Sequence, residues 1–182
     1  MISEELKTII DKLNDQGKMA FLEGATEEQI AQFEKDHEII LPTKYKEWLQ
    51  HSDGGEFFLP AGVQLYGVAH KPLIDIKDDD RPDDNYIVIG ALASGDPVLC
   101  EKSGEKIAIY DHETGNIDDE LVYDDFFALL KDLYDLLGIK NSNWFRKEKE
   151  QGIGLRSNRR TFLIQIKEKR MTRTVAPLKD ST

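Results

Sequence analysis

Six aspartates within ten residues form the densest group of side chains that could do chemistry: Asp75, Asp78, Asp79, Asp80, Asp83 and Asp84. Carboxylates can hold divalent cations, but calcium loops alternate acidic positions, contain a glycine and end on a glutamate. This run has adjacent aspartates and an Arg-Pro insertion instead. A solvated loop, or a patch that docks a basic partner, is therefore favoured over a specific metal site.

No other residues have the spacing of a familiar catalytic or metal site. The four histidines are His37, His51, His70 and His112. They lack the H-E-x-x-H pattern, and the chain has no G-x-S-x-G elbow, phosphate-binding loop or dinucleotide fingerprint. Cys100 follows Val98 and Leu99, so we expect a buried small hydrophobic residue. We predict no cofactor and no metal, although a catalytic aspartate in the turn at Asp96 remains an alternative.

Charge is distributed unevenly along the 182 residues. Residues 151–182 carry eight Lys or Arg and two acidic residues, a net charge of +6, so the total of −11 leaves −17 on residues 1–150. An acidic body repels phosphates, which disfavours direct nucleic-acid binding. It favours a basic protein partner, and solubility alone is the other interpretation.

The compartment is expected to be the cytoplasm. No apolar run approaches the roughly 20 residues that span a bilayer, so no membrane association is predicted. The first residues, MISEE, are acidic and lack the basic and apolar regions of a signal peptide. A single cysteine cannot form an internal disulfide.

Two consecutive helices between residues 26 and 55 organise the N-terminal half. Thr26 and Gln29 have capping-box spacing, which predicts a helix start. Pro42 suits the first position of a second helix, because its missing N–H would have no partner there. The apolar stripe of that helix is Tyr45, Trp48 and Leu49. Asp53, Gly54 and Gly55 are predicted to end it, since they tolerate positive φ.

The other elements follow from apolar periodicity. Spacing of the apolar residues predicts a first helix at about residues 3–13, and 19–22 is a candidate short extended piece. Period-two patterns predict strands at residues 56–59, 63–68, 86–92, 98–101 and 106–111, and a further strand beginning near Ile117. Asp124 or Asp125 can cap a helix at residues 126–137 that seals one face of the sheet. These patterns indicate an α+β fold with N-terminal helices, a mostly antiparallel sheet of about five or six strands, and a closing C-terminal helix.

The helical segment resembles the signature of the SUKH superfamily of the Smi/Knr type: an acidic capped helix, a Leu-Pro step, an aromatic stripe and a Gly-Gly pair. The matching residues are Thr26, Glu28, Ile30, Phe33, Leu41, Pro42, Tyr45, Leu49, Gly54 and Gly55. The strand, Gly95-Asp96 turn and strand that follow are similar to the family's central sheet. The resemblance implies one domain over residues 1–138. Residues 139–182 form a basic extension that does not match the pattern.

This resemblance implies a non-enzymatic immunity protein that binds and neutralises a polymorphic toxin, often a nuclease. The predicted partner is a basic toxin domain. The charged part of the interface is expected at Asp78, Asp79, Asp80, Asp83, Asp84, Asp118, Asp119 and Glu120. The alternatives are a regulatory adaptor of the Smi/Knr type that binds several proteins and, less favoured, a carboxylate-dependent hydrolase.

Overall fold

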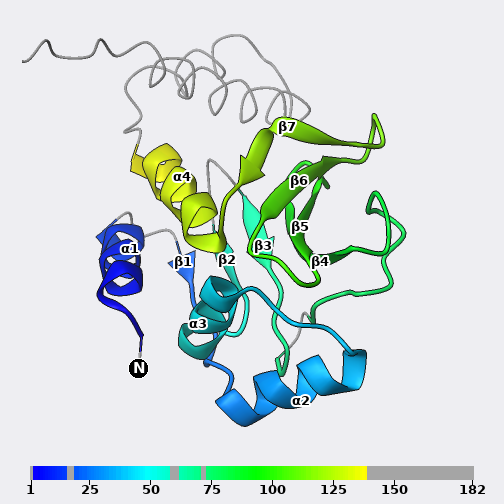
Figure 1. Cartoon of the computed structure of the whole chain (residues 1–182). Helices are drawn as coiled ribbons and strands as arrows, with labels where there is room; N and C mark the ends of the chain where they lie inside the picture. The colour runs from blue at the N-terminus through cyan, green and yellow to red at the C-terminus, as the bar shows by residue number, and fades with distance from the viewer. Residues whose placement is uncertain (1, 16–18, 58–61, 71–72, 139–182) are drawn as a thin grey trace, which may run out of the picture. The chain divides into compact units, whose positions relative to one another are not determined.

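The computed structural model describes residues 2–15, 19–57, 62–70 and 73–138, with side chains as far as residue 133. The predicted basic extension lies outside these residues. The elements, in chain order, are α1 (Glu4–Asp15), β1 (Met19–Ala20), α2 (Glu27–His37), α3 (Thr43–His51), β2 (Gly55–Phe57), β3 (Val63–Leu65), β4 (Tyr86–Leu92), β5 (Pro97–Glu101), β6 (Ile107–Asp111), β7 (Asn116–Tyr123) and α4 (Phe126–Gly138) (Figure 1).

The α+β class is confirmed, and the sheet has a simple topology. Seven described strands follow one another from β1 to β7 in sequence order, and each neighbouring pair is antiparallel. The predicted count of five or six is slightly low. The two-residue strand β1 is too short to show a period, and β7 runs for eight residues although its first part is polar.

The helix ends show where local sequence rules hold. Thr26 and Gln29 form the predicted capping box at the start of α2, with both reciprocal hydrogen bonds present. Pro42 is the N-cap of α3 with extended backbone, so its prediction as the first helical residue was wrong by one position. The helix ends at His51 with Ser52 as an extended C-cap, and only Gly54 and Gly55 of the predicted terminator have positive φ.

The core lies between the sheet and the helices α1, α3 and α4, which gather beside β1, β2 and β3 in Figure 1. Its centre is aromatic: the Trp48 ring lies 5.9 Å from both Phe57 of β2 and Phe126 of α4. Trp48 is fully buried, as is Tyr45, whose ring lies 4.7 Å from Phe126. The helix α4 also packs against α1 and β7, so it closes the helical layer as predicted.

A buried carboxylate joins the end of α3 to the segment after β3. Asp53 has no exposed surface, and its two oxygens accept the backbone N–H groups of residues 68, 69 and 70 at 2.7, 2.8 and 2.6 Å. The Nδ1 atom of His70 lies 3.0 Å from the same carboxylate. Because buried charge is costly unless it is hydrogen-bonded, this arrangement holds the segment rigidly in one place.

Small residues and a serine complete this junction. Gly67 lies so close to Asp53 that a Cβ atom there would come within 2.5 Å of the carboxylate. Gly54 has φ of 101°, and its Cβ would lie 2.8 Å from the carbonyl oxygen of Leu65. The Ser52 hydroxyl donates to the carbonyl of Gly54 and accepts the N–H of Leu22, which ties in the chain after β1. The junction thus links the helices to three neighbouring strands.

Charged side chains connect α1, α3 and α4 at the surface. The Lys44 ammonium lies 3.0 Å from Asp125 and 3.4 Å from Glu5, and Lys131 also pairs with Glu5. The hydrogen bond from Lys131 lowers the pKa of Glu5. Partial burial pushes the pKa of Asp125 upward, but hydrogen bonds from Lys44 and the Ala128 N–H outweigh burial and lower it.

Replacing Asp53 with asparagine should destabilise the protein by about 2–3 kcal/mol, because an amide cannot accept all the N–H groups that the carboxylate accepts. Urea denaturation followed by tryptophan fluorescence measures this loss. Asp79→Asn removes the same charge from an exposed side chain and should change stability by less than about 0.5 kcal/mol. Equal stability of Asp53→Asn and the native protein would show that the junction is not held by the carboxylate.

Lys44→Met should cost about 1 kcal/mol at pH 7, more than Lys35→Met, which removes a charge from the exposed face of α2. Glu5 and Asp125 have folded pKa values below their ordinary values of about 4.3 and 3.9, so their ion pairs stabilise above that range and are lost as pH falls through the folded values. The difference between the two variants should therefore be full at pH 6 and shrink below about pH 4. Urea denaturation at several pH values tests this, and a gap that does not shrink as the pH falls from 6 toward 2 contradicts it.

Candidate functional site

The predicted acidic cluster forms a loop in which most of the aspartate side chains stabilise the loop itself. One oxygen of Asp75, of Asp78 and of Asp83 accepts the backbone N–H two residues later, at 2.8, 2.7 and 2.7 Å. Such turns fix the backbone locally and are a common reason for aspartate in loops. Three of the six carboxylates therefore shape the loop, whatever else they bind.

Arg81 stabilises the same loop through hydrogen bonds to backbone carbonyl oxygens. Its guanidinium donates to the carbonyl oxygens of Asp78 and Tyr86 at 2.7 and 2.9 Å and pairs with Asp84 at 2.7 Å. The arginine side chain is 13% exposed, whereas that of Asp84 is 92% exposed. The planar guanidinium thus fixes the loop's shape and neutralises one of its charges.

Asp79 and Asp80 are the two carboxylates of this loop that neither accept one of these turn hydrogen bonds nor pair with Arg81. Both are exposed, and neither side chain forms an ion pair with another described residue. Because the turns and Arg81 fix the backbone beneath them, these two charges are held in place without being paired. They are the part of the predicted cluster best suited to meet a basic partner, and that role remains a prediction.

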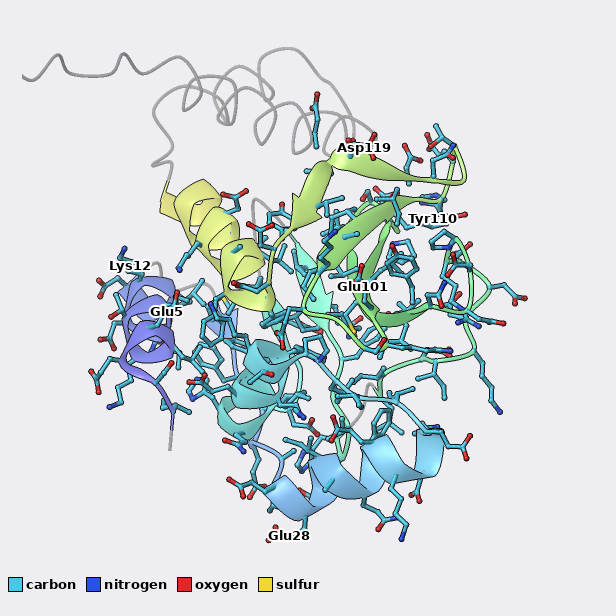
Figure 2. The ribbon with its side chains drawn as sticks, viewed as in Figure 1. Glu5, Lys12, Glu28, Glu101, Tyr110 and Asp119 are labelled. Carbon is cyan, nitrogen blue, oxygen red and sulfur yellow. The ribbon has the colours of Figure 1, made fainter. Side chains whose placement is uncertain are left out.

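The second predicted run, Asp118 to Glu120, lies in an irregular part of the edge strand β7. Ala108 pairs with Val122 and Tyr110 with Ile117, so Ile109 alone on β6 stands opposite residues 118–121. One oxygen of Asp118 accepts the Glu120 N–H at 3.0 Å. Asp119 and Glu120 are exposed, and Figure 2 shows Asp119 at the end of the molecule far from Glu28 of α2. Charges and bulges also protect an edge strand from pairing with other chains, so this run has a structural explanation too.

A second buried aspartate connects two turns at the other end of the sheet. Asp96 is 1% exposed, accepts the Ser94 hydroxyl at 2.6 Å and lies 2.9 Å from Nδ1 of His112. Serine and histidine both contact the carboxylate, whereas a catalytic triad needs the serine to contact the histidine. Asp96 and Gly95, whose backbone forms the turn, therefore join the β4–β5 and β6–β7 connections.

Sequence reasoning missed the roles of Asp53, His70 and His112. Asp53 looks like a helix terminator beside two glycines, and its partners come from a segment fifteen or more residues later. No described group of three or more His, Cys, Asp or Glu side chains is placed to hold a metal ion. Cys100 is buried as expected, and burial raises the pKa of its thiol.

The residues that carry the family signature in the sequence are mainly structural. The buried ones are Ile30, Phe33, Leu41, Pro42, Tyr45, Leu49, Gly54 and Gly55. The Tyr45 hydroxyl donates to the carbonyl oxygen of Tyr66 at 2.6 Å, and burial raises its pKa. Glu28 is exposed in the first turn of α2, where a hydrogen bond from its own backbone N–H and one from Thr26 lower its pKa.

No helix in the described part of the chain is long and apolar enough to cross a membrane.

Arg81→Met should loosen the acidic loop without unfolding the sheet, because it removes two hydrogen bonds to carbonyl oxygens and one ion pair. We expect a stability loss of about 1–3 kcal/mol, the range for hydrogen bonds to a charged group. Amide hydrogen exchange at residues 80 and 85 should accelerate more than exchange in β5. Lys77→Met, which removes an exposed charge from the same loop, is the control. Unchanged loop exchange in Arg81→Met would contradict this role.

Comparison with known proteins places these elements in a family. The profile of the SMI1 / KNR4 family (SUKH-1) matches residues 24–132, which begin just before α2 and end within α4. None of the curated proteins matches the chain. The matched residues cover more than half of the sequence and include the capped helix, the Asp53 junction, the acidic loop and all the strands from β2 to β7. The chain belongs to the SMI1 / KNR4 family (SUKH-1).

Proposed function

We propose that this protein is an immunity protein that binds a basic toxin domain and blocks its activity, without catalysing a reaction itself. Membership of the SUKH-1 family carries the proposal, because the resemblance to that family implies toxin neutralisation. A nuclease is the kind of toxin that its charge favours, since a nuclease surrounds its substrate groove with Lys and Arg.

The charge of the described body supports this choice of partner. Residues 1–140 contain 31 acidic and 13 Lys or Arg residues, a net charge of −18. Complementary charge of this size accelerates association and selects among partners, whereas buried apolar contacts supply most of the affinity. Asp79 and Asp80 then act as a fixed pair of charges at the edge of the interface.

Binding by a rigid surface needs little rearrangement. The loop carrying Asp79 and Asp80 is shaped by three aspartate turns and by Arg81. A preformed loop loses little conformational entropy when a partner docks, so more of the contact energy appears as affinity. This order is the structural feature expected of an inhibitor that must capture its target quickly.

The test is to capture partners from the source cell on the full chain at low and at moderate salt, and to identify them by mass spectrometry. We expect one basic protein that stays bound at moderate salt. Its nuclease activity should fall when the purified chain is added in equal amount. Many weak partners that are lost together as salt rises would favour the adaptor, and no partner at either salt would reject the proposal.

The double variant Asp79→Asn/Asp80→Asn should slow association with the captured protein severalfold at low salt and weaken its salt dependence. The double variant Asp11→Asn/Asp15→Asn removes the same charge from exposed positions on α1 and should have a smaller effect. Surface plasmon resonance at two salt concentrations compares the two. Equal effects would mean that total charge matters and that the loop is not at the interface.

A further inference from the structure

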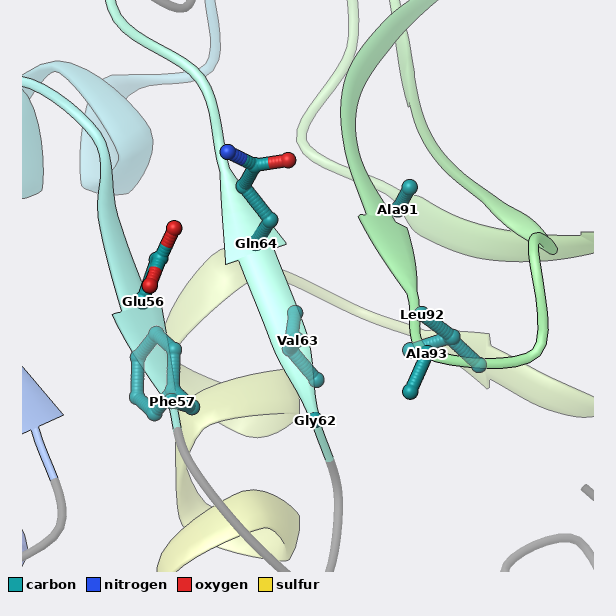
Figure 3. A pocket seen from close by; sticks show the side chains of 8 residues that line it. All are labelled: Glu56, Phe57, Gly62, Val63, Gln64, Ala91, Leu92 and Ala93. Atoms are coloured by element: carbon teal, nitrogen blue, oxygen red, sulfur yellow. The ribbon is translucent and has the colours of Figure 1, made fainter. Parts of the chain in front are cut away.

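A small groove lies across strands β2, β3 and β4. Its volume is about 230 Å³, and its lining residues are Glu56, Phe57, Gly62, Val63, Gln64, Ala91, Leu92 and Ala93 (Figure 3). Directly opposed residues of antiparallel strands share a face, so Glu56, Gln64 and Ala91 form one row across the sheet. Phe57 stacks on Trp48 of α3, so by alternation this row faces away from the helices.

Two polar side chains in this row have no side-chain hydrogen bond or ion pair within the described part of the chain. Glu56 is exposed and Gln64 is partly exposed, and neither side chain forms a hydrogen bond or ion pair with another described residue. Figure 3 shows the carboxylate and the carboxamide on adjacent strands, with the short side chain of Ala91 on the third. Small residues at positions 62, 91 and 93 leave the space beside them open.

The size and chemistry of the groove define what it can hold. Small-molecule sites usually exceed about 300 Å³, so this groove suits one long side chain better than a cofactor. Its polar groups offer acceptors: both Glu56 oxygens and the amide oxygen of Gln64. An arginine has five donors in a plane and an aliphatic stem, so it could pair with the carboxylate, donate to Gln64 and pack against Ala91.

We propose that this groove is the anchor pocket for an arginine side chain of the basic protein partner. The inference rests on the proposed function, and it adds a site formed by residues outside both acidic runs. Glu56 supplies the charge, Gln64 orients the guanidinium, and Ala91 leaves room for the aliphatic stem. Arginine is among the residues most often found at binding hot spots, the few side chains that carry most of the energy of an interface.

The first experiment uses a defined probe and needs no knowledge of the partner. The full chain, labelled with ¹⁵N, is titrated with N-acetyl-arginine-N′-methylamide at low salt and followed by NMR. The citrulline analogue, which has the same length but no charge, is the matched control. We expect saturable shifts at Glu56, Gln64 and Ala91 and at the Gln64 side-chain amide with the arginine compound alone.

Variants test whether the NMR chemical-shift changes arise from binding in the groove. Glu56→Gln should weaken binding of the arginine compound about tenfold, the effect of losing one charged hydrogen-bonded pair. Asp11→Asn removes an equal charge from an exposed position on α1 and should leave binding at the groove unchanged. Equal shifts with the citrulline compound, or shifts confined to the loop around Asp79 and Asp80 and insensitive to Glu56→Gln, would overturn the inference.

The captured partner separates this inference from the proposed function. A partner that binds Glu56→Gln and the native protein with equal affinity would remove the groove from the interface but leave the immunity proposal intact. A partner that binds Glu56→Gln at least about tenfold more weakly, while it binds Asp11→Asn like the native protein, supports both. If no toxin is found while the arginine compound still occupies the groove, the immunity proposal fails and the groove's selectivity for arginine stands.

Discussion

The interaction on which the rest of the structure depends is the buried carboxylate of Asp53 and the N–H groups that it accepts. Without hydrogen bonds, this charge would strongly destabilise the folded state. The segment at residues 68–70 must therefore stay where its N–H groups donate to the carboxylate. Gly67 permits the close approach, and Ser52 connects the same point to the chain after β1. The helical layer and the sheet are consequently fixed to each other by polar contacts at one end and by the Trp48 aromatic core beneath it.

The division between fixed and exposed carboxylates follows from the same physics. An aspartate whose oxygens are occupied by backbone N–H groups shapes the chain, as Asp53 does inside and Asp78 does in the loop. An aspartate without such partners, such as Asp79, contributes charge to the solvent and to any approaching protein. A count of acidic residues therefore overstates the number available for recognition. Some of the loop's carboxylates stabilise its backbone conformation. That fixed conformation lets the remaining charges meet a partner with little loss of conformational entropy.

Local signals made most of the elements predictable, and long-range contacts explain what was missed. The Thr26 cap, the apolar stripe at Tyr45 and Trp48, and the short apolar runs of β4 to β6 are properties of neighbouring residues. The sequence predicts only a candidate extended piece at residues 19–22, because the pairing of β1, like the role of Asp53, depends on partners fifteen or more residues away, which no local pattern contains. The groove could not be predicted either, because Glu56, Gln64 and Ala91 become neighbours only through strand register.

The exposed charges of the acidic loop and the groove at Glu56 contribute differently to the proposed recognition. Exposed charges such as Asp79 act over several ångströms through solvent, so they govern encounter and are weakened by salt. Glu56 lies across the sheet from Ala91 in a groove sized for one side chain, where the proposed arginine would form a direct ion pair that must break before the partner leaves. Variants of the loop should consequently alter association rates, whereas variants of the groove should alter dissociation rates. A partner that depended on charge alone would show the first effect without the second, and this difference separates specific inhibition from the general attraction of an acidic protein for basic ones.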